Sequence, residues 1–303
     1  MKVRAGLVAI CVLATVAVST TPASAVTPVV VVASRANEYR PAASTTFLAW
    51  TKVLRDYSGR VMAEAIGGSP FRVSAKGANA STGGIDGSTL MYEQGGDIAL
   101  FDLSTKTALP VPDGVNTKAF ELALGISGTH LLFYRAPSQS RYSIVLFNTA
   151  TGTSLVLYSH KDTSRRFAYL QAGQLNGNYA VWDQWVLSTP DFAPIRCDVT
   201  VYDIAAATST KVPNPGKRCL SGPAVSADGT LYFDRAGLGC GQHARIIEQP
   251  LGGTGSVLYS LPNGHDYSGA VAVDNGDGTT DVYFDPADCF GQRNEDIWKL
   301  PGV

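Results

Sequence analysis

The sequence lacks the features that would place it in a membrane or on a nucleic acid. After Val26 it has no apolar run near the roughly 20 residues that a membrane-spanning helix needs. It has 24 Lys and Arg against 25 Asp and Glu, so the basic excess of nucleic-acid-binding proteins is missing. No segment shows a helical apolar period of useful length. We therefore expect an all-β protein with no membrane span and no nucleic-acid partner.

Motifs for common chemistry are also missing. No G-x-S-x-G occurs, and only four histidines are available as imidazole bases. Zinc sites need cysteine pairs spaced as C-x₂₋₄-C, whereas Cys197, Cys219, Cys240 and Cys289 stand 22, 21 and 49 residues apart. The fifth cysteine, Cys11, lies in the N-terminal stretch that we expect to be cleaved, and the four that remain, an even number in an exported chain, favour two disulfides.

The N-terminus has the pattern of a secretory signal peptide. Lys2 and Arg4 precede an apolar stretch at residues 5–18, and small residues at Ala23 and Ala25 favour cleavage after Ala25. Without Lys2 and Arg4, the mature chain has 22 basic against 25 acidic residues, a net charge of about −3. We expect residues 1–25 to be the signal peptide and residues 26–303 to form one soluble domain that is secreted or otherwise extracytoplasmic.

One pattern occurs six times along the mature chain. A strand ends in an aromatic residue followed by a polar one, as in FLAWT at 47–51 and TLYFDR at 230–235. The spacings between these aromatics are 42, 42, 48, 51 and 51 residues, a period typical of propeller blades. The six aromatic markers are Trp50, Tyr92, Tyr134, Trp182, Phe233 and Phe284.

The segments around each marker predict a four-stranded antiparallel unit. Before five of the six markers stands a pair typical of a two-residue hairpin turn, such as Asp86-Gly87 or Asn176-Gly177. After the marker come a loop, a third alternating strand such as 97–103, and a fourth such as 153–159. The sequence therefore predicts a six-bladed β-propeller.

The last unit ends after its third strand, and a β-branched run at 27–34 precedes the first unit. An open ring would leave edge strands able to pair with other chains. We expect residues 28–32 to complete the last blade beside Ile297 and Trp298, and the protein to be a monomer.

Three segments carry a family resemblance. SADGTLYF at 226–233 resembles the S-P-D-G-x-x-I-x-F repeat of TolB-type propellers, with Ala227 in place of Pro. RVMAEAIGGSPFRVS at 60–74 resembles the companion segment of that repeat, and VDNGDGTTDVYF at 273–284 is a looser copy. The resemblance implies a secreted TolB-like propeller, a scaffold used for protein contacts, small-ligand binding and occasional catalysis.

The residue after each marker defines a column of mostly charged side chains. Because this residue lies where the second strand leaves its blade, we expect the column to gather at one mouth of the ring. The alternative is that each side chain braces its own hairpin. The predicted ligand-binding residues are Glu93, Arg135, Asp183, Asp234 and Asp285, with Thr51 as the sixth member of the column.

The repeat also suggests the disulfide pairing. Cys240 and Cys289 lie six and four residues after Asp234 and Asp285, in equivalent loops of adjacent blades. We expect the pairs Cys197–Cys219 and Cys240–Cys289, with Cys219–Cys240 as the alternative, and both bridges at the mouth that carries the column.

We expect no cofactor, although DNGDGTTD at 274–281 keeps calcium as an alternative, because it carries oxygen side chains at close spacing. The function we predict is an exported scaffold that binds a protein, a peptide or a cell-envelope component at one mouth, without catalysis. The alternative is a hydrolase or lyase that uses a metal or an acid/base pair at the same mouth.

Overall fold

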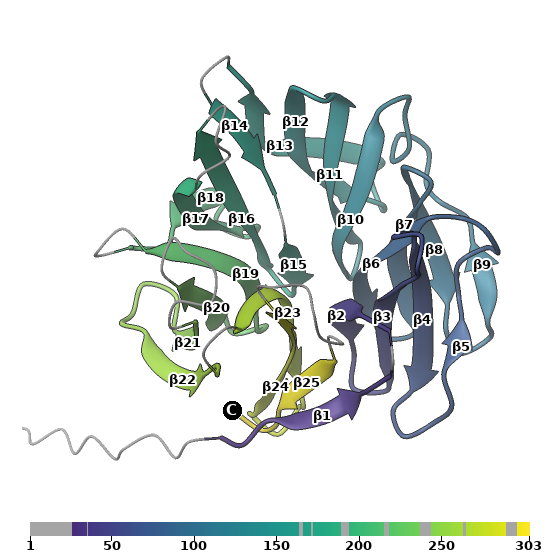
Figure 1. The fold of residues 1–303 in the computed structure, drawn as a ribbon. Coiled ribbons are helices and arrows are strands. Elements are labelled where there is room, and N and C mark those ends of the chain that lie inside the picture. The colour runs from purple at the N-terminus through teal and green to yellow at the C-terminus, as the bar shows by residue number, and fades with distance from the viewer. Residues whose placement is uncertain are drawn as a thin grey trace, which may run out of the picture.

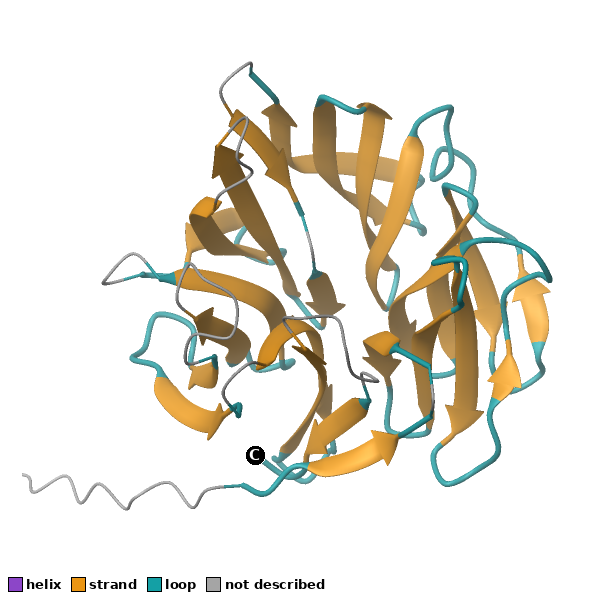
Figure 2. Ribbon diagram, in the orientation of Figure 1, coloured by secondary structure: helices purple, strands orange, loops and turns teal. Residues whose placement is uncertain are grey.

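Six β-sheets stand like blades around a common axis in the computed structural model (Figure 1), and every regular element it describes is a strand (Figure 2). The structure describes residues 26–34, 36–163, 166–170, 172–188, 194–214, 218–236, 244–262, 265–288 and 296–303. No helix in this part of the chain is long and apolar enough to cross a membrane. The predicted six-bladed, all-β fold is confirmed.

Each blade is an antiparallel sheet whose strands follow one another along the chain from the axis outward, with β1 as the exception. Blade 1 holds β2 (Glu38–Ala43), β3 (Phe47–Val53), β4 (Gly59–Ala65) and β5 (Phe71–Arg72). Blade 2 holds β6 (Ala80–Asp86), β7 (Thr89–Gln94), β8 (Asp97–Asp102) and β9 (Thr107–Leu109). Blade 3 holds β10 (Phe120–Ser127), β11 (His130–Ser138), β12 (Arg141–Asn148) and β13 (Thr153–Lys161).

Blade 4 differs because two segments share its innermost position and both pair with its second strand. It holds β14 (Arg166–Tyr169), β15 (Gly173–Asn176), β16 (Tyr179–Ser188), β17 (Pro194–Asp203) and β18 (Thr208–Lys211). Blade 5 holds β19 (Cys219–Val225), β20 (Leu231–Ala236), β21 (Arg245–Gln249) and β22 (Ser256–Ser260). Blade 6 holds β23 (His265–Asp274), β24 (Thr280–Asp288), β25 (Ile297–Leu300) and β1 (Val29–Val32).

The core lies between neighbouring blades, because each sheet presents alternate apolar side chains to the sheets on both sides. The six aromatic markers all lie on second strands, and five of them are at most 5% exposed; Tyr134 is partly buried. Phe233 of blade 5, for example, belongs to one apolar cluster with Val181 and Val201 of blade 4. Each repeat of the sequence therefore places one aromatic side chain in the apolar layer between two blades.

Turns between first and second strands define one face of the ring, which we call the turn face. In blades 2, 3 and 4 these are two-residue turns whose first residue is a left-handed glycine, such as Gly87 with φ 57°. Blades 5 and 6 instead have five-residue turns at 226–230 and 275–279, closed by backbone bonds such as Ser226 N to Thr230 O. The prediction of two-residue turns is wrong for these two blades. In blade 5 the Asp228 side chain accepts a hydrogen bond from the Thr230 amide, which stabilises a wider loop.

The opposite face, where second strands end and third strands begin, we call the loop face. The N-terminal strand β1 is the outer strand of blade 6, with Val30 opposite Trp298 on β25. Figure 1 shows β1 and β25 side by side at the rim of the ring. Val31 and Val32 pack against the apolar cluster that contains Trp50 and Ile297, so the first and last strands close the ring together.

One disulfide is present in the described part of the chain. Cys197 on β17 and Cys219 on β19 are bonded with their Cα atoms 4.6 Å apart, as expected from the sequence. The bridge joins blade 4 to blade 5. Cys240 and Cys289 lie outside the described residues, so their pairing stays a prediction.

Candidate functional site

The predicted column lies at one level of the ring but inside it. Thr51, Asp183, Asp234 and Asp285 are fully buried, and Glu93 is 4% exposed. Arg135 is the one member that is partly exposed. Buried charges need hydrogen-bonding partners, so the contacts of these side chains decide what they can do.

Three members of the column connect neighbouring blades. Asp183 accepts hydrogen bonds from the Ala172 amide of its own blade at 3.0 Å and from the Gly222 amide of blade 5 at 3.1 Å. Asp285 does the same with the Gly269 and Arg40 amides, both at 2.9 Å. Thr51 Oγ1 accepts from the Thr82 amide of blade 2 at 2.9 Å. These side chains tie adjacent innermost strands together.

The other three members have local contacts. Asp234 accepts from the Arg245 amide at 2.9 Å, and Glu93 from the Gly96 amide at 2.6 Å. Arg135 forms an ion pair with Glu121 at 2.9 Å. The described contacts therefore favour bracing over direct ligand contact, and ligand binding by these residues stays a prediction.

Arg40 on β2 is the residue around which part of the column gathers, and it is not among the residues predicted from the sequence. It has a left-handed backbone, with φ 53°, which is uncommon for a residue with a Cβ. Its guanidinium donates to Ser81 Oγ at 3.1 Å and to the Ala123 carbonyl at 3.3 Å. Burial lowers the pKa of Arg40, while the nearby carboxylates of Asp285, Glu93 and Asp183 oppose that shift.

Side chains fill the axis of the ring. Gln174 on β15 donates to the Ala272 carbonyl and accepts from the Val225 and Ala272 amides, so it bridges blades 4, 5 and 6. A void of about 20 Å³ lies beside Arg40, and a hollow of about 280 Å³ opens on the turn face. The axis is thus a braced core at the level of Arg40 and Gln174.

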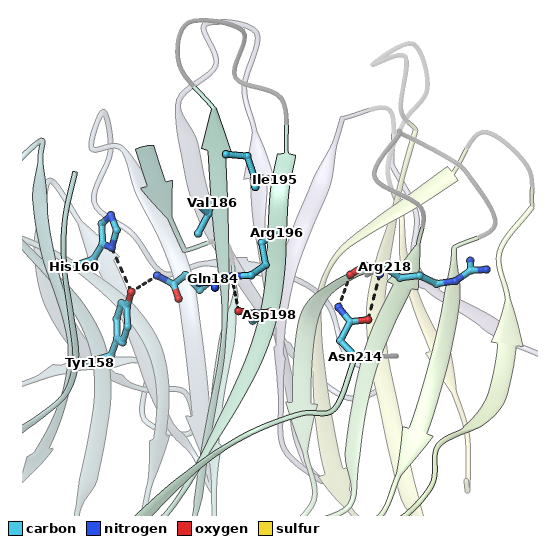
Figure 3. A pocket seen from close by; sticks show the side chains of 9 residues that line it. All are labelled: Tyr158, His160, Gln184, Val186, Ile195, Arg196, Asp198, Asn214 and Arg218. Atoms are coloured by element: carbon cyan, nitrogen blue, oxygen red, sulfur yellow. Dashed lines mark hydrogen bonds and ion pairs between the residues drawn. The ribbon is translucent and has the colours of Figure 1, made fainter. Parts of the chain in front are cut away.

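A larger cavity, of about 480 Å³, lies at the loop face between blades 3 and 4, a volume typical of ligand sites. We call it the inter-blade pocket (Figure 3). It opens between the outer strand of blade 3 and the second and third strands of blade 4. Its lining residues are Tyr158, His160, Gln184, Val186, Ile195, Arg196, Asp198, Asn214 and Arg218.

A chain of polar side chains forms one wall of the pocket. Gln184, the residue after Asp183, donates from Nε2 to Tyr158 Oη. Tyr158 Oη lies 3.3 Å from His160 Nδ1, and His160 Nε2 lies 3.1 Å from Asp162 Oδ1. The His160–Asp162 contact has the distance of an ion pair but not the geometry of a hydrogen bond, and His160 Nε2 has no hydrogen-bond partner among the described residues.

The opposite wall carries the charges, and the disulfide fixes its position. Arg196 and Lys211 both pair with Asp198, at 2.8 and 3.1 Å. Cys197 stands between Arg196 and Asp198, while its partner Cys219 directly follows Arg218. The bridge therefore holds two arginine-bearing segments of blades 4 and 5 beside one another. Charged neighbours on both cysteines were a sequence feature that could have pointed to this pocket.

The calcium alternative falls on the turn between β23 and β24. Asp274 accepts from Asn176 Nδ2 and from the Ala227 amide, and Asp281 pairs with Lys299 at 2.6 Å. Asp277 accepts from the Thr279 amide within the turn. Across the described residues, no cluster of three or more His, Cys, Asp or Glu side chains has the arrangement of a metal site.

Comparison with known proteins identifies the fold alone. No protein-family model matches the chain, and no curated protein matches it. A TolB of Agrobacterium tumefaciens is similar in structure with a TM-score of 0.56 at 14% identity, over 88% of this chain and 92% of that one. The β-propeller domain of the Trilobed protease of Pyrococcus furiosus has a TM-score of 0.51 at 12% identity, over 89% and 97%. The fold is TolB-like, and proteins of different function share it.

Proposed function

We propose that this protein is an extracytoplasmic binding propeller that receives a peptide segment of a partner protein in the inter-blade pocket, without catalysis. The observation that carries the proposal is the pocket itself. It is an open cavity of about 480 Å³ at the loop face, while Arg40 and Gln174 close the axis of the ring at their own level.

The lining suits a peptide. Ile195 is 49% exposed, so it offers apolar surface at the entrance, and Val186 adds to it. The Asn214 amide binds the Arg218 backbone and Gln184 Nε2 binds Tyr158, so these two side chains shape the polar wall. Arg196 and Arg218 against the single lining carboxylate of Asp198 leave a positive balance, which favours an acidic side chain on the partner.

The location outside the cytoplasm rests on three observations. The N-terminal sequence has the pattern of a secretory signal peptide. The disulfide Cys197–Cys219 is typical of oxidising compartments. The absence of a membrane-spanning helix among the described residues agrees with a soluble product. In this proposal Asp183 supports the pocket from below, because it fixes the inner part of blade 4 to the innermost strand of blade 5.

The test uses a phage-displayed peptide library selected on residues 26–303. We expect enriched acidic peptides whose binding, measured by fluorescence anisotropy, weakens at least about tenfold in Ile195→Ser and Arg196→Gln. Ile66→Ser is the matched control, because Ile66 is 51% exposed but lies outside the pocket. Peptides that bind the pocket variants as tightly as the wild type would contradict the proposal.

One observation favours a second candidate function. The Tyr158–His160–Asp162 cluster places a hydroxyl 3.3 Å from one imidazole nitrogen and a carboxylate oxygen 3.1 Å from the other, and these are residue types that general acid/base catalysis uses. A hydrolase or lyase using it would lose turnover of chromogenic esters or glycosides in His160→Gln. No turnover by the wild type would exclude this candidate for those substrates.

A further inference from the structure

We propose a second site, on the other face of blade 3, that binds a tetrahedral oxyanion such as phosphate or sulfate through Arg141, Lys161, Ser143 and Ser159. A cavity of about 330 Å³ lies there, at the loop-face end of β12 and β13. Its lining contains these four residues and no carboxylate. His160 is the one lining residue that it shares with the inter-blade pocket, so the proposal does not depend on the proposed function.

Strand register brings the four side chains together. Arg141 lies directly opposite Lys161, and Ser143 directly opposite Ser159. Directly opposed residues in an antiparallel pair have Cβ atoms about 4.5–5.5 Å apart, and alternate residues share a face. The two cations and the two hydroxyls therefore occupy one small patch of one face.

The opposed cations are the unusual feature. Like charges directly across two strands destabilise a sheet. Among the residues that the structure describes, no carboxylate forms an ion pair with Arg141 or Lys161. The whole chain carries a formal charge of −1, so this positive patch is local and is not part of a general basic surface. A bound anion would remove the repulsion.

The hydroxyls supply the remaining donors. Ser143 Oγ and Ser159 Oγ lie 3.0 Å apart and share one hydrogen bond, which uses one of their two hydrogens. The other hydrogen is able to point into the cavity. A guanidinium, an ammonium and a hydroxyl together match the several acceptor oxygens of a tetrahedral oxyanion better than a halide or a single carboxylate.

The first experiment titrates inorganic phosphate and inorganic sulfate into the mature protein by calorimetry, with sodium chloride at matched ionic strength as the reference. We expect binding of both oxyanions above the chloride background. Loss of both charges in Arg141→Gln/Lys161→Gln should weaken it at least about tenfold, and Ser143→Ala/Ser159→Ala less. The matched control is Arg55→Gln/Lys76→Gln, which removes one exposed Arg and one exposed Lys elsewhere.

A second measurement separates anion binding from loss of folding. At low ionic strength without oxyanion, Lys161→Gln should raise the thermal midpoint, because it removes the repulsion across the strands. Addition of phosphate should raise the midpoint of the wild type and leave that of the double variant unchanged. No preference over chloride, or equal phosphate binding by the double variant, would overturn the proposal.

Two further probes identify the source of the oxyanion. Glycerol 3-phosphate carries the same group free in solution, and phosphatidylglycerol vesicles carry a phosphate at a lipid surface. Binding of glycerol 3-phosphate alone assigns a soluble phosphate ester, and binding of both assigns a headgroup. Sensitivity of either to Arg141→Gln/Lys161→Gln supports the site, and insensitivity contradicts it.

Discussion

The two faces of the ring use the same kind of hydrogen bond at different depths. On the turn face, polar side chains at the turns accept from the backbone of the neighbouring turn: Asp86 from Gly128 at 2.7 Å, and Ser127 from Gly177 at 3.1 Å. On the loop face, Asp183 and Asp285 make such inter-blade bonds in the interior. On the turn face, therefore, surface side chains hold the blades together.

The difference explains where the cavities lie. The interior carboxylates brace the loop-face half of the ring from below. The residues above them are therefore not needed to hold the blades together. The inter-blade pocket and the cavity at Arg141, of about 480 and 330 Å³, both open there, whereas the turn face has a smaller hollow of about 280 Å³. We infer that the turn face mainly maintains the ring and that the loop face offers the larger cavities for recognition.

The largest expected difference between the faces comes from removing an interior carboxylate. Asp183→Ala leaves two buried backbone amides without their acceptor, so we expect a loss of about 3 kcal/mol in the free energy of unfolding. Asp86→Ala, on the exposed turn face, should cost about 1 kcal/mol or less. Urea unfolding of both variants measures this, and equal losses would contradict the proposed division.

Removing the disulfide should have the next largest effect, and only on the loop face. Cys197→Ser/Cys219→Ser should lower the free energy of unfolding by about 2–4 kcal/mol, since the bridge closes a chain segment of 22 residues. Peptide binding at the inter-blade pocket should weaken as well. Hydrogen exchange of the Gly128 and Gly177 amides should stay slow under native conditions, and faster exchange there would show that the faces are coupled.

A single link of the turn-face network should have a smaller effect. Ser127→Ala removes the acceptor of the Gly177 amide, which then bonds to water, so we expect a loss of about 0.5–1 kcal/mol. Exchange of the Gly177 amide should become faster in this variant. Unchanged peptide binding at the pocket is the matching control for the loop face.

The smallest predicted effects are changes in stability with pH, and they have opposite signs on the two faces. Burial raises the pKa of Glu38 on the loop face, even though Lys52 lies 3.7 Å away. The folded protein therefore loses stability as the pH rises from the ordinary pKa through the raised value. Glu38→Gln should be more stable than the wild type at pH 7, and the advantage should fade near pH 4.

On the turn face the sign reverses. Burial opposes ionisation of Asp281, but hydrogen bonds from Lys299 and the Gly302 amide outweigh it and lower the pKa of the carboxyl. Its contribution is present above the ordinary pKa and is lost as the pH falls through the lowered value. Asp281→Asn should be less stable at pH 7 and converge with the wild type in acid. Thermal midpoints across pH 3–8 check both variants.

The sequence predicts the repeating parts of this fold because they depend on local rules. The marker aromatics lie on second strands since a turn glycine and strand alternation fix their position within a few residues. Cys197–Cys219 follows from the same blade-by-blade comparison. The sequence predicts Asp183 where its strand leaves the blade, at the mouth of the ring, but it lies in the middle of β16 and is fully buried. Its partners are the amides of Ala172 and Gly222, and which amides a side chain reaches is decided by packing between blades.

The pocket was not predicted because it combines different strands of two blades. Tyr158 comes from the outer strand of blade 3, and Gln184 from the second strand of blade 4. Nothing in a 42- to 51-residue period indicates that these two side chains meet. Arg40 was missed for a related reason: its left-handed backbone depends on the bulge between Tyr39 and Ala42 within β2.

The pairing of β1 with β25 has a consequence for when this protein becomes complete. Val29 lies opposite Lys299, so this contact joins residues 270 positions apart in the sequence. During synthesis β1 is made before the other strands, and its partner β25 is made last. Contacts between residues so far apart in the sequence form slowly. Until β25 has been made, β1 has an open edge and blade 6 is unfinished, so the ring closes only when the last strand is in place.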